Sequence, residues 1–299
     1  MGESLLSARD LTRTSIETLL ASARSYEVGT GTRHEGAVVG LWFFEDSVRT
    51  RVGFDVAAAR LGARTAALVA TKRSDAMGYA ESVEDAVRSV ADWCDVACLR
   101  TGDPTLVGRL TGSLRCSIVN CGNGLDEHPS QAVADVFAIQ RQVGAVDGLR
   151  IAIVGNLLES RTARSLALTL GSFDGVTIRS IAPRGLHLPA ALHAELTRNG
   201  VTVEETATLD VDDVDVVYVA GLPAGTPDGG RLAPEEQAAL RITPAVVRSL
   251  QPQARILCPL PRLDEIERDV DDLDAAGYFE QSRTALFTRM AILDRALAA

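Results

Sequence analysis

Short apolar segments alternate with helix-like segments along this chain, and this alternation constrains the fold more than any other feature. In the first half, the apolar segments with the length and composition of buried strands are Ala37–Phe44, Ala66–Ala70, Asp95–Leu99 and Cys116–Asn120. The segments with helical spacing of apolar residues are Arg51–Leu61, Ser82–Ala91 and Gln131–Gln142. Such alternation predicts an α/β fold in which a mostly parallel sheet is flanked by helices.

A second alternating set follows a glycine-containing turn at 144–148. Its predicted strands are Arg150–Val154, Val176–Ile181, Val201–Thr206, Val214–Val219 and Arg255–Leu257. Its predicted helices are Arg161–Leu170, Pro189–Arg198 and Pro244–Leu250, and Ala285–Leu297 forms an amphipathic tail. With 299 residues, two domains are expected, at 1–145 and 146–280, and the helix within 281–299 is expected to return to the first domain.

The composition restricts the class of protein. The net charge of −10 argues against general nucleic-acid affinity, although a local basic pocket for a small anion remains compatible with it. The five cysteines are odd in number and lie mainly in apolar segments, which favours buried free thiols in a reducing cytoplasm. Their spacing predicts no zinc site, and neither a signal peptide nor a membrane span is expected. A cytoplasmic protein is therefore predicted.

Two arginines and two hydroxyls lie between the first predicted strand and its helix, in Ser47-Val48-Arg49-Thr50-Arg51. Free backbone N–H groups and the positive end of a helix dipole favour an anion at such a place. The planar guanidinium of arginine matches phosphate oxygens. A helix cap with solvated arginines explains the same residues equally well, so the motif alone leaves both interpretations open.

Two further polar residues are expected at the same edge of the first sheet. His128 follows a glycine- and asparagine-rich loop and precedes a helix, at an edge where open α/β sheets bind ligands. A neutral imidazole there can donate a hydrogen bond to a carbonyl oxygen that gains negative charge. Arg100 ends the strand Asp95–Leu99. A capping histidine and a solvated arginine are the alternatives.

The second half offers two similar positions. Arg161 follows the strand Arg150–Val154 through a turn and could bind a carboxylate, although a solvated arginine at a helix start is equally compatible. The turn has one glycine rather than the three of a dinucleotide fingerprint, so NAD binding is poorly supported. Near the end, two prolines make 258–262 an extended loop whose carbonyls could accept hydrogen bonds from an amine or amide, or that serves only as a rigid connector.

Five motifs in order resemble the aspartate/ornithine carbamoyltransferase family, nearer its aspartate branch, over nearly the whole chain. The segment 44–51 resembles the family's phosphate-binding Ser-Thr-Arg-Thr-Arg, and Glu81-Ser82 resembles the end of its mobile loop. His128-Pro129-Ser130-Gln131 resembles His-Pro-Thr-Gln, and Cys258-Pro259-Leu260-Pro261-Arg262 resembles His-Pro-Leu-Pro-Arg. The stretch 279–291 resembles the family's C-terminal helix.

The resemblance implies a carbamoyl phosphate-binding first domain and a second domain that binds the amine substrate. Ser47, Arg49, Thr50 and the backbone N–H of Val48 would hold the phosphate. Arg100 and His128, with Thr50, would hold the carbamoyl oxygen. It also implies that no metal or organic cofactor is needed.

The carbamoyl amide would be bound by Gln131 and by the carbonyl of Leu260. Arg161 would bind a carboxylate of the acceptor. The family's catalytic subunits are trimers in which a mobile loop reaches a neighbour's site, so a homotrimer with shared active sites is implied.

Three positions depart from the family pattern. Val48 replaces a threonine, which is a mild change if only its backbone contacts phosphate. Tyr79 stands where the mobile loop carries a lysine, and its contact with a site is left open. Gly221 and Pro223 replace the arginine and glutamine that hold the side-chain carboxylate of aspartate. Loss of such a charged anchor weakens binding.

These departures predict a carbamoyltransferase that acts on carbamoyl phosphate and on an amino-acid-like amine other than aspartate. Two alternatives remain open at this point. One is a non-catalytic paralogue that binds a ligand or partner. The other is an aspartate carbamoyltransferase with a rebuilt anchor that uses Arg231.

Overall fold

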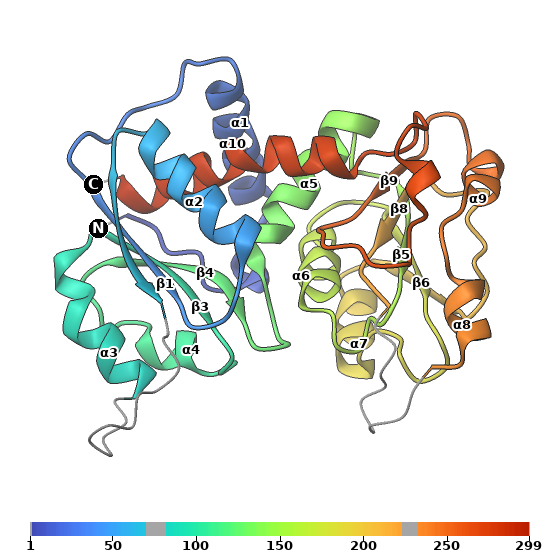
Figure 1. Ribbon diagram of the computed structural model, residues 1–299, viewed down its shortest axis with the longest axis horizontal. Coiled ribbons are helices and arrows are strands. Elements are labelled where there is room, and N and C mark those ends of the chain that lie inside the picture. Colours follow the sequence, from blue (N-terminus) through green and yellow to red (C-terminus); the bar gives the residue numbers. More distant parts are fainter. Residues whose placement is uncertain (1, 70–81, 223–231, 299) are drawn as a thin grey trace. The chain divides into compact units, whose positions relative to one another are not determined.

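Two compact units make up the computed structural model, which describes residues 2–69, 82–222 and 232–298. The first unit contains 1–134 and 284–299, and the second contains 135–283. Each unit is a parallel sheet flanked by helices (Figure 1). The predicted fold class is confirmed, and the end of the C-terminal helix belongs to the first unit as expected.

The first unit has a four-stranded sheet in the order β2-β1-β3-β4, and every pairing is parallel. Its strands are β1 (Val38–Phe43), β2 (Arg64–Val69), β3 (Val96–Thr101) and β4 (Ser117–Asn123). Its helices are α1 (Arg13–Glu27), α2 (Val48–Arg60), α3 (Val83–Val90) and α4 (Leu106–Leu110), with 3₁₀ turns η1 (Ala8–Asp10) and η2 (Ala91–Trp93). Trp42, Leu99 and Leu106 are among the buried side chains of its core.

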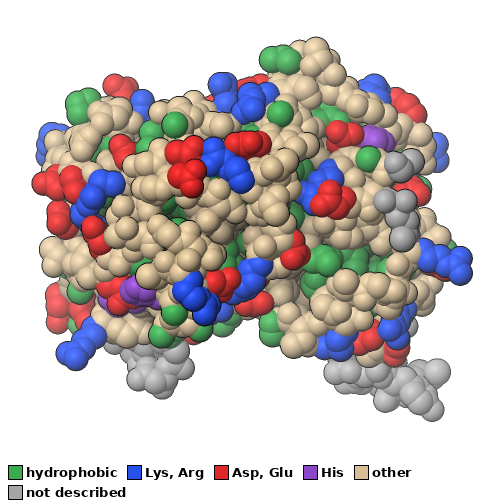
Figure 2. Space-filling view, turned by 180° about the vertical axis from the view of Figure 1, so that it is seen from behind, with side chains coloured by type: hydrophobic (Ala, Val, Ile, Leu, Met, Phe, Trp, Pro, Cys, Tyr) green, Lys and Arg blue, Asp and Glu red, His purple; other side chains and the backbone are tan. Residues whose placement is uncertain are grey.

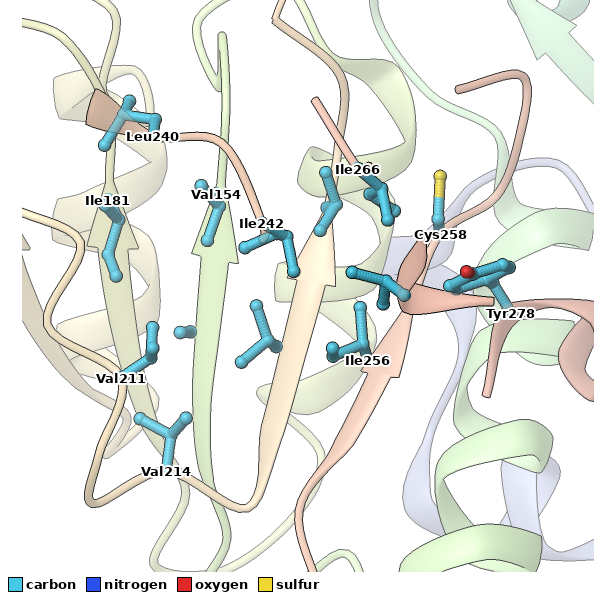
Figure 3. Packing of buried hydrophobic residues seen from close by; sticks show 14 residues of the cluster. Val154, Ile181, Val211, Val214, Leu240, Ile242, Ile256, Cys258, Ile266 and Tyr278 are labelled. Atoms are coloured by element: carbon cyan, nitrogen blue, oxygen red, sulfur yellow. The ribbon is translucent and has the colours of Figure 1, made fainter. Parts of the chain in front are cut away.

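The second unit has a five-stranded parallel sheet in the order β7-β6-β5-β8-β9. Its strands are β5 (Arg150–Val154), β6 (Thr177–Ile181), β7 (Thr202–Thr206), β8 (Val216–Val219) and β9 (Arg255–Leu257). Its helices are α6 (Arg161–Leu170), α7 (Ala190–Arg198), α8 (Pro234–Ala239) and α9 (Pro244–Ser249), with the 3₁₀ turn η3 (Arg268–Val270). Aliphatic side chains from β5, β6, β8 and β9 pack on one face of this sheet together with Tyr278 (Figure 3).

The boundaries between the two units lie within two helices. They are α5 (Pro129–Val143) and α10 (Tyr278–Leu297). Both begin earlier than predicted, at Pro129 rather than Gln131 and at Tyr278 rather than Ala285. Proline is favoured at the first helical position because it lacks the N–H that would be unpaired there, which explains the early start of α5.

The helix α2 also begins earlier than predicted, at Val48 rather than Arg51. Ser47 is extended and is the N-terminal cap residue, so Arg49 and Thr50 lie in the first helical turn. Gly62 follows the helix with a φ of +80°, as expected for a glycine that ends a helix. The sequence prediction did not include α1, α4 and α8.

The described residues contain no helix that is both long and apolar enough to cross a membrane. The five cysteines are free, and only Cys94 is partly exposed. On the face shown in Figure 2, acidic and basic side chains are interspersed rather than gathered by sign.

A buried hydrogen-bond network joins three elements of the second unit. The carboxylate of Asp135 on α5 is fully buried. It accepts a hydrogen bond from the Tyr218 hydroxyl at 2.8 Å and another from Gln281 Nε2 at 2.7 Å. Gln281 Oε1 in turn accepts the backbone N–H of Cys258 at 2.8 Å. Removal of one partner from such a network leaves a buried polar group unsatisfied.

We expect Asp135→Asn to lower the free energy of unfolding by about 1–3 kcal/mol. The asparagine N–H₂ group would face the Tyr218 hydroxyl or the Gln281 amide, and both of these groups are donors. Gln281→Glu alone places two buried carboxylates together and should also destabilise the chain. The double variant restores an amide–carboxylate pair, so its loss should be smaller than the sum of the two single losses. Urea unfolding of the four proteins measures this coupling, and additive losses would contradict the proposed network.

Candidate functional site

The site of the first unit is built at the carboxyl edge of its sheet. The strands β1, β3 and β4 are neighbours and parallel, so their carboxyl ends lie side by side. Phe43 pairs with Arg100, and the N–H of Phe44 donates to the Arg100 carbonyl at 2.9 Å. The residues that follow these strands therefore share one edge.

The residues of the predicted anion site lie at the start of α2. The Ser47 side chain makes no capping hydrogen bond and is half-buried, while Arg49 is exposed. The side chain of Val48 is 76% exposed, so its backbone N–H is the group that can serve an anion. The first-turn N–H groups and the helix dipole favour a negatively charged ligand at this place.

The structure brings Thr50 and His128 together. Thr50 Oγ1 lies 3.5 Å from His128 Nε2, which is the outer limit of a hydrogen bond. Both side chains are buried. Gln131 is also buried and lies in the first turn of α5, three residues after His128. The starts of α2 and α5 therefore meet at the edge of the sheet.

Arg100 is held in place by partners on both sides. Its Nη1 donates to the carbonyl oxygen of Cys121 at 3.2 Å, and its Nε lies 3.6 Å from Glu45 Oε2. The Arg100 side chain is only 10% exposed, so this guanidinium is oriented rather than freely solvated. The Glu45 contact was not predicted, although Glu45 lies in the motif 44–51.

Glu127 anchors the loop that carries His128, and the sequence prediction also missed it. The buried Glu127 carboxylate accepts hydrogen bonds from Ser7 Oγ at 2.8 Å and from Ala8 N at 2.5 Å, and it pairs with Arg9 at 2.6 Å. Burial raises the pKa of Glu127, although these hydrogen bonds and Arg9 partly oppose the shift. The N-terminal segment thus fixes the residue that precedes His128.

The residues predicted in the second unit lie at the carboxyl edge of the second sheet. Arg161 is the first residue of α6 and is half-buried, and the Ser160 hydroxyl caps this helix by accepting the Ala163 N–H at 3.2 Å. Leu260 follows β9 with a φ of +54°, a conformation that leucine rarely adopts. The N–H of Leu260 donates to Cys258 Sγ at 3.4 Å.

The loop at 258–262 is fixed at both ends. Cys258 is held through Gln281, as described above. At the other end, Arg262 pairs with Asp271 and donates to the Tyr278 hydroxyl at 2.9 Å. This pairing lowers the pKa of Asp271. A carbonyl on such a loop is a preorganised acceptor.

Gly221 follows β8 and has a backbone shape that excludes most other residues. Its φ is +90°. Its carbonyl accepts the Asn156 N–H at 2.9 Å, and a Cβ at Gly155 would lie 2.2 Å from the same oxygen. An arginine at 221 would be strained in this conformation. Tyr79, Pro223 and Arg231, which the sequence analysis singled out, lie outside the described residues.

A pocket of about 510 Å³ lies beside the start of α2, between the end of β1 and one flank of the helix. Ser47, Arg51 and Asp55 contribute to its wall, together with Val48 and Val52. The exposed valines of α2 are Val48, Val52 and Val56, at 76%, 55% and 40% exposure. They recur every four residues, so they form one apolar stripe on the helix.

The chain matches two family profiles in succession. Residues 3–141 match the aspartate/ornithine carbamoyltransferase carbamoyl-P binding domain, and residues 147–296 match the Asp/Orn binding domain of the same family. The catalytic subunit of aspartate carbamoyltransferase from Methanopyrus kandleri is 38% identical, with 97% of this chain and 96% of the relative covered. The chloroplastic aspartate carbamoyltransferase 1 of Pisum sativum is 31% identical, with 97% and 78% covered.

Solved structures show the same similarity. Aspartate transcarbamoylase from Trypanosoma cruzi in complex with carbamoyl phosphate superposes with a TM-score of 0.89 at 30% identity, covering 99% of this chain and 96% of that chain. The catalytic subunit of the Methanocaldococcus jannaschii enzyme superposes with a TM-score of 0.88 at 31% identity, covering 99% and 97%.

Proposed function

The chain belongs to the aspartate/ornithine carbamoyltransferase family and is a carbamoyltransferase, and from this premise we propose that it transfers the carbamoyl group of carbamoyl phosphate to the amine of an amino acid. The observation that carries this proposal is the contact between the buried side chains of Thr50 and His128 at the start of α2, with the buried Arg100 on the neighbouring strand β3 at the same sheet edge. A solved relative that was crystallised with carbamoyl phosphate supports the choice of donor.

The proposed reaction begins with attack of a neutral amine on the carbamoyl carbon. Negative charge then develops on the carbonyl oxygen, where Arg100, His128 and Thr50 donate hydrogen bonds. The bond to phosphate then breaks while the attacking nitrogen loses a proton to an oxygen of the departing phosphate. The charge on this leaving group is stabilised by Arg49, Ser47 and the first N–H groups of α2. The binding of both reactants in one orientation removes much of the entropic barrier.

Aspartate is the first candidate acceptor, because the compared relatives are aspartate carbamoyltransferases. These relatives do not support the sequence-based expectation of a different amine. Arg161, at the start of α6, is the proposed partner of the acceptor's α-carboxylate, since a half-buried guanidinium binds a carboxylate through two parallel hydrogen bonds. The predicted role of Leu260 stays a prediction.

An amine acceptor other than aspartate is the second candidate, and Gly221 is the observation that favours it. The family's arginine at this position holds the side-chain carboxylate, whereas the left-handed backbone at Gly221 disfavours any such side chain. An acceptor that lacks a second carboxylate would need no anchor there. A non-catalytic paralogue is not favoured, because the buried and oriented set of Thr50, Arg100 and His128 is retained.

We propose that the chain forms a homotrimer and that the valine stripe Val48, Val52 and Val56 lies in its interface. Contiguous exposed apolar residues beside a pocket are typical of surfaces that a partner covers. A copy that covered this stripe would also close the pocket beside the start of α2.

We expect Arg49→Ala to weaken binding of phosphonoacetate, a mimic of carbamoyl phosphate, by at least about tenfold, because it removes a charged hydrogen-bond donor. Isothermal titration calorimetry measures this loss. Arg60→Ala is the matched control, since Arg60 is an exposed arginine in the last turn of the same helix. Equal affinities of both variants and wild type would contradict the assignment of the phosphate site.

We expect an acceptor panel to separate the two candidate acceptors. With carbamoyl phosphate present, carbamoylated product is measured by mass spectrometry for aspartate and for amino acids with neutral, basic or shorter acidic side chains. Product from aspartate at the highest kcat/KM supports the first candidate. A higher kcat/KM for an acceptor without a second carboxylate supports the second candidate, and no product from any amine would refute carbamoyl transfer.

We expect Val52→Asp to dissociate the proposed trimer, because a charge would be buried at the interface. Light scattering coupled to size-exclusion chromatography measures the mass in solution. Val28→Asp is the control, since Val28 is 74% exposed and is the cap residue that follows α1. A wild-type mass of 31.7 kDa, that of one chain, would contradict the trimer.

A further inference from the structure

The two ring nitrogens of His128 contact two different hydroxyls. Nδ1 lies 3.2 Å from Ser130 Oγ, and Nε2 lies 3.5 Å from Thr50 Oγ1. His128 and Ser130 are 5% and 3% exposed, so water does not freely replace either contact. The local geometry therefore bears on which nitrogen of the ring carries the proton.

The ring is expected to be neutral in the free protein. His128 directly precedes the first residue of α5. The positive end of the helix dipole, together with burial, disfavours an imidazolium there. A neutral imidazole has one N–H donor and one acceptor nitrogen. Only the form with hydrogen on Nε2 presents a donor on the side of Thr50, where the carbamoyl oxygen is proposed to lie.

We propose that the Ser130 hydroxyl donates its hydrogen to His128 Nδ1 and thereby holds the ring in the Nε2–H form. Ser130 is then a positioning residue, which acts on the reaction through His128 without contact with the substrate. The catalytic meaning of this role rests on the proposed function. The tautomer itself does not, and it can be measured without any substrate.

The protein contains a matched pair for comparison. In the second unit, Ser180 Oγ lies 3.0 Å from His187 Nδ1. Ser180 is fully buried on β6, and neither residue belongs to the proposed catalytic machinery. Ser180→Ala thus removes the same kind of contact from a different histidine.

The test is a long-range ¹H–¹⁵N correlation spectrum of ¹⁵N-histidine-labelled protein. The chain has four histidines, and loss of one signal set in His128→Gln assigns that residue. We expect wild type to show a protonated Nε2 and an unprotonated Nδ1 at His128. Ser130→Ala should shift this ring toward a mixture of tautomers, Ser130→Thr should retain the wild-type pattern, and Ser180→Ala should change only His187.

The kinetic readout is the second arm of the test. Once an acceptor is found, Ser130→Ala should lower kcat by about 2- to 10-fold, the range expected for one hydrogen bond, with KM for carbamoyl phosphate unchanged. Ser130→Thr should recover the rate. Loss of folded enzyme would also lower the apparent kcat at constant KM, so unchanged signals of the other histidines and recovery of the rate by Ser130→Thr are what separate this role from misfolding.

Two results would overturn the proposal. One is a wild-type His128 with hydrogen on Nδ1. The other is an Nε2–H tautomer that Ser130→Ala leaves unchanged. Failure of the proposed function is distinguishable from both, because absence of carbamoyl transfer together with the expected spectra would refute the function and leave the role of Ser130 intact.

Discussion

The hydrogen bonds of the buried Asp135 carboxylate are the interaction on which the second unit depends. It accepts hydrogen bonds from the Tyr218 hydroxyl on β8 and from the Gln281 amide on α10, and Gln281 in turn accepts a hydrogen bond from the N–H of Cys258. One charged group thus fixes a strand, a helix and the loop that follows β9. The cost of burying this charge is offset only while every partner is present. The position of the loop that follows β9 depends on that condition.

The sequence predicted both sheets because most strands are short apolar segments between helical segments, as Val38–Phe43 illustrates. The strand β7 (Thr202–Thr206) is the polar exception. The sequence placed the starts of α6 and α9 correctly, at Arg161 and Pro244. It began α2 and α5 too late, because neither Val48, which is exposed, nor Pro129 belongs to the apolar pattern that predicted these helices. The helix α1 was not predicted, although its buried residues recur at helical spacing, including Ile16, Leu19 and Ala23. Short α4 and α8 have too few turns to show a period.

The sequence could not predict the partners of the site residues, and the reason is a different one. The contacts Glu45–Arg100 and Thr50–His128 join residues 55 and 78 positions apart, so only the fold brings them together. The left-handed backbone at Leu260 is also a consequence of tertiary contacts, since leucine has no local preference for it. Residue types at strand ends predict where a site lies, and long-range contacts decide how its groups are oriented.

Two departures from the family pattern, Val48 and Gly221, affect two different modes of ligand recognition. At the start of α2, the proposed phosphate site uses backbone N–H groups, so a threonine-to-valine change at Val48 leaves those groups in place and alters only a side chain of the exposed valine stripe. At the end of β8, the family pattern holds a carboxylate through an arginine side chain, whereas Gly221 has no side chain and a backbone conformation that arginine rarely adopts. Backbone recognition tolerates sequence change, whereas side-chain recognition does not. A change of residue therefore leaves a backbone N–H contact of the proposed donor site intact, whereas loss of a side-chain contact in the proposed acceptor site requires a rebuilt anchor or a different acceptor.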